Sequence, residues 1–108
     1  MKQKYTAVAD LLMDIEKELR LLQLWDSEIP SPEALASTQP FAVDTLNFPQ
    51  WLQFIFIPKL YFIIEQQTML PATSGVAPMA EEYFQVLQLH SAPLIAYLQK
   101  IDAVISEP

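Results

Sequence analysis

A single glycine, Gly75, occurs among the 108 residues of this chain. An all-β fold needs several tight turns with positive φ, and glycine is the residue that adopts such φ values most easily. This scarcity argues against a fold built from hairpins. Because 52% of the residues are hydrophobic, wholesale disorder is excluded, and a chain of this length can bury one core. We therefore expect residues 1–108 to form a single all-α domain.

The N-terminal segment carries the clearest helical periodicity. Its apolar residues recur in alternating steps of three and four, at Tyr5, Val8, Leu12, Ile15, Leu19 and Leu22. This spacing predicts a helix over about residues 3–25, with one face packed on other helices. Asp10, Asp14 and Glu18 lie on another face. We interpret them as a solvated face rather than as metal ligands, because His90 is the only histidine.

The run from Pro49 to Gln67 is apolar nearly all round, which predicts a helix that other elements surround. Proline at its start suits a first helical turn. Inside the run, Pro58 removes the backbone hydrogen bond to the carbonyl of Phe54 and crowds that carbonyl, so we expect a kink or a change of packing partner. A pair of buried strands is the alternative, since isoleucine and phenylalanine favour sheets. The length of the run and Pro58 itself favour the helix.

Proline also marks the starts of the other helices. Ser31 as a cap, Pro32 in the first turn and Glu33 near the positive helix end predict a short helix that ends before Pro40. Pro78 is expected to open another helix. The predicted buried face of that helix consists of Met79, Tyr83, Val86 and Leu87.

The last helix is expected to begin around Pro93, with Ser91 as its cap. Its predicted core side consists of Leu94, Leu98, Ile101 and Ile105. Together these elements describe a four-helix bundle with an extra short helix and a proline-interrupted, largely buried central helix.

The charge balance excludes several classes of partner. The net charge is −7, and the six lysines and arginines are scattered along the chain rather than clustered. Binding to nucleic acid depends on such residues neutralising phosphates, so we expect no direct contact with DNA or RNA. No window is apolar and uncharged enough to cross a membrane, and acids interrupt any export signal at the N-terminus. We expect a soluble, cytoplasmic protein and leave its oligomeric state open.

Enzymatic activity is not expected from this composition. The chain has no cysteine, which excludes thiolate chemistry, and one glycine, which excludes a phosphate-binding loop. Ser–His–acid catalysis would have to use His90, and the chain contains no G-x-S-x-G motif. The acids lie mainly on predicted solvent faces. We therefore assign no catalytic residue, no metal ligand and no cofactor.

Several short motifs together resemble one known family. They are STQPF (Ser37–Phe41), DTL (Asp44–Leu46), WLQ (Trp51–Gln53), IPKL (Ile57–Leu60), LP (Leu70–Pro71) and VAP (Val76–Pro78). In this order and spacing they resemble the YqcC-like family of small bacterial helical proteins of unknown function, over essentially the whole chain. The resemblance implies a helical bundle in the bacterial cytosol. It also implies a link to a tRNA pseudouridine synthase, because family members are often encoded beside one.

The same region collects seven of the twelve aromatic residues, between positions 41 and 62. The candidate partner or ligand surface consists of Thr38, Gln39, Phe41, Asp44, Thr45, Trp51 and Gln53. We favour a non-enzymatic protein-interaction module whose partner is a tRNA pseudouridine synthase. The functional alternative is a pocket for a small apolar ligand near residues 37–54. A purely structural role, in which these residues cap turns and fill the core, stays open.

Overall fold

The computed structural model describes residues 2–87 and 91–107. Its helices are α1 (Lys2–Leu21), α2 (Pro32–Leu35), the 3₁₀ turn η1 (Pro40–Ala42), α3 (Phe48–Trp51), the π-helical η2 (Leu52–Phe56), α4 (Ile57–Gln66), α5 (Val76–Val86) and α6 (Ala92–Ser106). α3, η2 and α4 follow one another without a break and form one central helix. No strand occurs in the two described ranges. The predicted all-α bundle, with four long helices and the short α2, is confirmed.

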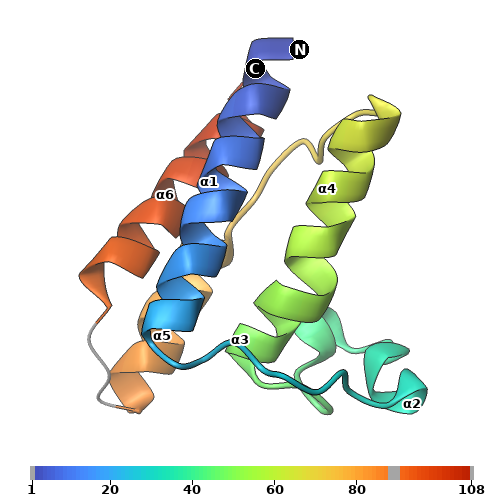
Figure 1. Cartoon of the computed structure of the whole chain (residues 1–108), viewed down its shortest axis with the longest axis vertical. Coiled ribbons are helices and arrows are strands. Elements are labelled where there is room, and N and C mark those ends of the chain that lie inside the picture. The colour runs from blue at the N-terminus through green and yellow to red at the C-terminus, as the bar shows by residue number, and fades with distance from the viewer. Residues whose placement is uncertain (1, 88–90, 108) are drawn as a thin grey trace.

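α1 and α6 lie side by side and run antiparallel (Figure 1). The apolar residues of these two helices that are at most 2% exposed are Val8, Leu12, Ile15, Leu19, Leu94, Leu98, Ile101 and Ile105. The sequence spacing predicts all eight. At the end where the two termini meet, Lys4 Nζ donates a hydrogen bond to the carbonyl of Glu107. α5 packs on α6 and α4 contacts α1, so the remaining long helices are built onto this pair.

The central helix accommodates Pro58 by changing its helix type. Before this proline, η2 forms a wider π-helical turn, and the N–H of Ile57 donates to the carbonyl of Leu52, five residues earlier. Proline has no N–H to donate, and its ring crowds the carbonyl four residues before it, so a regular α-helical turn is unfavourable here. The predicted disturbance at Pro58 is therefore present, and the helix continues beyond it as α4.

Burial along the central helix is uneven. Its buried residues are Phe48, Pro49, Leu52, Gln53, Phe56, Ile57 and Leu60. Farther along α4, Ile63 and Ile64 are only partly buried, and Phe62 is 62% exposed. No residue from 48 to 57 is exposed, but Gln50, Trp51, Phe54 and Ile55 are only partly buried. The predicted burial on all sides is therefore right only in part for the first section of the helix and wrong for α4, which presents one of its sides to solvent.

α1 ends at Leu21, earlier than the end predicted near residue 25. Gln23 adopts a left-handed conformation with φ of 60°, and the N–H of Leu24 donates to the carbonyl of Leu19 at 2.8 Å. This is a Schellman ending, which turns the chain away from the helix axis. Glycine normally occupies the left-handed position, so its absence concealed the helix end from sequence analysis.

α4 ends in the same way. Gln67 has φ of 55°, its N–H donates to the carbonyl of Ile64 at 3.1 Å, and the N–H of Thr68 donates to the carbonyl of Ile63 at 3.1 Å. A side chain in the left-handed region crowds its own backbone. The chain therefore carries a small strain at the end of each of these two helices.

Helix α5 begins at Val76, and its first turn is capped from α6. Gly75 precedes it and has no side chain to serve as a cap. Instead the carboxylate of Asp102 accepts hydrogen bonds from the N–H groups of Val76 at 3.0 Å and Ala77 at 2.7 Å, and from the Ser74 hydroxyl. A negative charge against free N–H groups at a helix start is favourable. Asp102 therefore fixes α5 against α6.

The predicted buried face of α5 is wrong in part. Val86 is 76% exposed and Leu87 49% exposed, while Met79 and Tyr83 are only partly buried. The residues of α5 that are buried are Val76, Ala77, Ala80 and Phe84. The face that packs on the core is rotated relative to the larger apolar stripe, because α6 approaches the side that carries the small residues.

Replacing Gln67 with glycine is expected to raise the free energy of unfolding by about 0.5–1 kcal/mol, because glycine adopts positive φ without steric cost. The matched control is Gln66→Gly, one residue earlier within α4, which is expected to lower it by up to about 1 kcal/mol. Urea denaturation of both variants measures the difference. Equal losses in the two variants would contradict the left-handed ending.

Replacing Asp102 with alanine is expected to lower the free energy of unfolding by about 2 kcal/mol, because three donors lose a charged acceptor. Asp10→Ala, an exposed position on α1, is the control and is expected to change stability by less than about 0.5 kcal/mol. Thermal and chemical denaturation compare the two. Amide exchange should also quicken at the start of α5 in the Asp102 variant.

Candidate functional site

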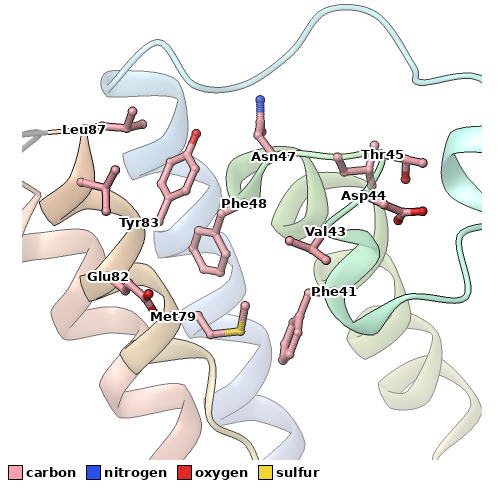
Figure 2. Close-up of a pocket in the computed structure, with 12 residues that line it drawn as sticks. Phe41, Val43, Asp44, Thr45, Asn47, Phe48, Met79, Glu82, Tyr83 and Leu87 are labelled. Atoms are coloured by element: carbon pink, nitrogen blue, oxygen red, sulfur yellow. The ribbon is translucent and has the colours of Figure 1, made fainter.

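An open groove of about 670 Å³ lies between α5 and the segment from Phe41 to Phe48. Figure 2 shows side chains from the two walls facing each other, with Phe48 between them. The lining residues are Phe41, Val43, Asp44, Thr45, Leu46, Asn47, Phe48, Met79, Glu82, Tyr83, Val86 and Leu87. Most of this lining is apolar. The groove is therefore a candidate binding surface.

Val86 and Leu87, which the sequence spacing assigned to the core, belong to the α5 wall of this groove. The residues that α5 and its end contribute are Met79, Glu82, Tyr83, Val86 and Leu87. They are spaced by three and four, so they form one stripe along the helix. The stripe that sequence spacing assigns to the core thus forms the wall of an open groove. Nothing in the spacing itself distinguishes a stripe that another helix covers from one that stays open.

The floor of the groove is a cluster of aromatic rings centred on Phe48. The centroid of this ring lies 5.8 Å from that of Tyr83 and 6.4 Å from that of Phe84, both on α5. The centroid of Trp51, on α3, is 6.2 Å away. Offset and edge-to-face pairs at these separations are stabilising. Phe41 stands edge-on to Trp51, with 4.9 Å between centroids. The cluster therefore ties both walls of the groove to the start of the central helix.

The wall opposite α5 has a strained backbone. Phe41 and Ala42 both adopt left-handed conformations, with φ of 58° and 50°, and each costs about 1–2 kcal/mol in a residue other than glycine. Side chains hold the segment in place. Thr45 Oγ1 donates to the carbonyl of Ala34 at 2.7 Å, and the Ser37 hydroxyl donates to Asp44. This geometry places the Phe41 ring, 38% exposed, at the edge of the groove.

The structure brings together part of the predicted surface. Phe41, Asp44 and Thr45 line the groove, and Trp51 lies against the Phe41 ring. Thr45 also has a structural role, which the sequence analysis left open, because its hydroxyl donates a hydrogen bond to a backbone carbonyl of α2. Thr38 and Gln39 are exposed but do not line the groove.

Gln53 lies apart from the groove and is 7% exposed. Its side-chain oxygen accepts from the N–H of Asp26 at 2.8 Å, and its side-chain nitrogen donates to the carbonyl of the same residue at 2.8 Å. The oxygen and the nitrogen of the Gln53 side-chain amide are thus both bonded to Asp26, and these bonds hold the segment after α1 against η2. Its position predicts a structural role.

A smaller, polar hollow adjoins the groove. It is lined by the segment from Gln23 to Ser27 and by Asn47, Pro49, Gln50 and Tyr83, and it shares Asn47 and Tyr83 with the groove. Asn47 caps α3 reciprocally with Gln50, an Asn-x-x-Gln pattern that the sequence analysis missed. The groove thus has an apolar section and a polar end.

The electrostatics of this region are negative. Glu82 and Asp44 line the apolar section, and Asp26 lines the polar end. The N–H of Glu28 and the side-chain amide of Gln50 donate to Asp26 and hold the pKa of its carboxyl below the ordinary value. Asp26 therefore stays ionised at neutral pH. Arg20 lies over the Trp25 ring nearby and bonds Glu16.

Few features of the described residues favour chemistry. Within residues 2–87 and 91–107, no three His, Cys, Asp or Glu side chains are grouped so that they could hold a metal ion. Ser91 stands at the cap position of α6, but its side chain makes no capping bond, and its buried hydroxyl has no partner in the described part of the chain. His90 lies outside the described residues. None of the helices in the described residues is long and apolar enough to span a membrane.

The fold and the groove describe a small all-α protein with an open, acidic candidate binding surface. The family model DUF446, described as "tRNA pseudouridine synthase C", matches residues 7–104. The chain belongs to this family. The family resemblance that the motifs carry is thereby confirmed.

Two uncharacterised proteins are similar to most of this chain. The uncharacterised protein YqcC of Escherichia coli K12 is 33% identical over 96 residues, covering 89% of this chain and 88% of its own. Its solution NMR structure superimposes with a TM-score of 0.79 at 30% identity and covers 96% of this chain and 89% of its own. An uncharacterised Haemophilus influenzae protein is 34% identical over 88 residues, or 79% and 83% of the two chains.

A further relative is a larger protein. A tRNA pseudouridine synthase C from Pectobacterium carotovorum is 38% identical over 64 residues, which are 59% of this chain and 17% of that protein. Most of the synthase therefore lies outside the similar segment.

Replacing Gln53 with leucine is expected to lower the free energy of unfolding by about 2 kcal/mol, because the N–H and carbonyl of Asp26 lose their partner. Gln85→Leu, at an exposed position of α5, is the control and is expected to change stability by less than about 0.5 kcal/mol. Urea denaturation measures both. If the two variants are equally stable, the amide pairing does not hold the segment after α1.

Proposed function

We propose that this chain is a non-enzymatic protein-interaction module that acts with a tRNA pseudouridine synthase. The observation that carries the proposal is the groove between α5 and the segment from Phe41 to Phe48. Interface centres are rich in aromatic residues and methionine, and the groove presents Phe41, Phe48, Tyr83 and Met79 together. Val86 and Leu87 leave a large part of their apolar surface in solvent. A partner that covers them gains hydrophobic stabilisation.

The identity of the partner is supported by the Pectobacterium synthase. In that protein a segment similar to this chain is covalently part of a molecule named tRNA pseudouridine synthase C. Covalent linkage keeps two units at high effective concentration, which favours pairs that work together. Where the two are separate chains, a binding surface has to replace the covalent link. The description of the matching family is consistent with this association.

In this proposal the module contacts the enzyme rather than the RNA, and it acts in the cytoplasm with its partner. Its net charge of −7 repels a phosphate backbone. The module contributes no catalytic residue of its own. Its role is to hold or position the enzyme that modifies tRNA.

A small apolar ligand is the second candidate occupant. The volume of about 670 Å³ lies within the range of small-molecule sites. A ligand that uses this site should raise the melting temperature of the wild-type protein and leave that of a Phe41→Ala variant unchanged. The open side of the groove and the stripe along α5 favour the protein partner.

Replacing Val86 and Leu87 with asparagine together is expected to weaken binding of the tRNA pseudouridine synthase C from the same organism at least tenfold, about 1.4 kcal/mol. Isothermal titration calorimetry with both purified proteins measures the affinity. Phe62→Asn is the matched control, since Phe62 is equally apolar and exposed but lies on α4 outside the groove. No binding by the wild type would refute the proposed function.

A further inference from the structure

We propose that the groove takes an amphipathic helix of the partner whose apolar face is flanked by lysines and arginines. The inference rests on the proposed function and adds the chemistry of the segment that docks. It commits to one kind of occupant, a basic helix. The argument comes from the shape of the α5 wall and from the charges that surround the groove.

The shape of the wall fits a helix. The stripe from Met79 to Leu87 follows one face of α5, and the eight residue-to-residue steps between its ends correspond to a rise of about 12 Å. A helix that packs along such a stripe inserts its own apolar residues, spaced by three and four, between those of the wall. The rings of Phe41 and Phe48 close the opposite side and the floor. The groove is therefore matched to two or three turns of a partner helix.

Charge selects the kind of helix. Glu82 belongs to the α5 wall, Asp44 to the opposite wall, and Asp26 to the polar end. Neither the groove nor its polar end is lined by a lysine or arginine among the described residues. An apolar helix with acidic flanks would be repelled by three carboxylates, whereas basic flanks would be attracted from both sides.

The partner that the proposed function names is suited to supply such a helix. An enzyme that binds tRNA needs lysines and arginines to neutralise phosphates. Its basic surface is attracted to a chain with a net charge of −7. A second copy of this chain is a poorer occupant, because the two copies repel each other.

A synthetic peptide tests this chemistry directly. The probe is a helix-forming peptide of about 18 residues, with leucines in steps of three and four and lysines on both flanks. Its control has glutamates in place of the lysines. Fluorescence anisotropy with the full chain is expected to show binding of the lysine peptide at least tenfold tighter than the glutamate peptide. Equal affinities, or no binding of either, would overturn the inference.

Two charge-reversal variants test whether the lysine peptide binds at the groove. Glu82→Lys is expected to weaken binding of the lysine peptide at least fivefold. The control Glu81→Lys makes the same change of net charge one residue away. Glu81 accepts a hydrogen bond from the Gln99 side chain and does not line the groove. It is expected to change affinity less than twofold. Equal losses in the two variants would show a general charge effect and overturn the inference. Circular dichroism checks that both variants are folded.

Titration of the intact synthase separates the inference from the proposed function. If the synthase binds and Glu82→Lys weakens it more than Glu81→Lys does, both are supported. If the synthase binds with equal affinity to both variants, the basic helix is wrong while the proposed function stands. If the lysine peptide binds the groove but the synthase does not, the proposed function fails, and the assignment of the helix to this enzyme fails with it. A dimer that Val86→Asn dissociates would assign the groove to a second copy and overturn the inference.

Discussion

The antiparallel packing of α1 on α6 is the interaction on which the rest of the structure depends. Each helix contributes four residues that are at most 2% exposed, and every other long helix contacts one of the two. Close packing of leucine and isoleucine leaves little freedom in how α5 and the central helix are placed against this pair. Asp102 of α6 then fixes the start of α5. One wall of the groove is thus set by a hydrogen-bonded carboxylate on the core pair.

The other wall depends on the central helix. Phe48 lies between the aromatic rings of α3 and α5, and Gln53 bonds the backbone of Asp26. The ring contacts of Phe48 hold the start of α3 close to α5, and the Gln53 bonds hold the segment after α1 against η2. The Thr45 bond to the carbonyl of Ala34 holds the segment before α3, although Phe41 and Ala42 have left-handed backbones. Such strain persists only where the surrounding contacts outweigh it, and it is often found at functional sites. The groove is therefore a built feature of the fold rather than a gap between loosely packed helices.

The relatives of this chain bear on the function that we propose for the groove. The uncharacterised relatives are similar over most of this chain, and the Pectobacterium synthase contains a segment similar to 59% of it within a larger protein. The exposed apolar stripe on α5 is the feature that supports a binding role in our proposal. The carboxylates that line the groove and its polar end are the reason why we propose a basic segment as its occupant. Fold, charge and family membership support the same proposal.

The sequence by itself determined the helices and the core pair, because local spacing shows which residues of a helix share a face. Val8 to Leu19 and Leu94 to Ile105 were predicted in this way. Only the tertiary structure decided which apolar stripes are covered. Val86 and Leu87 have the spacing of core residues and stay exposed, because α6 meets another side of α5. The uses of Gln53 and Asp102 also depend on partners more than 20 residues away in the chain, which no local pattern can indicate.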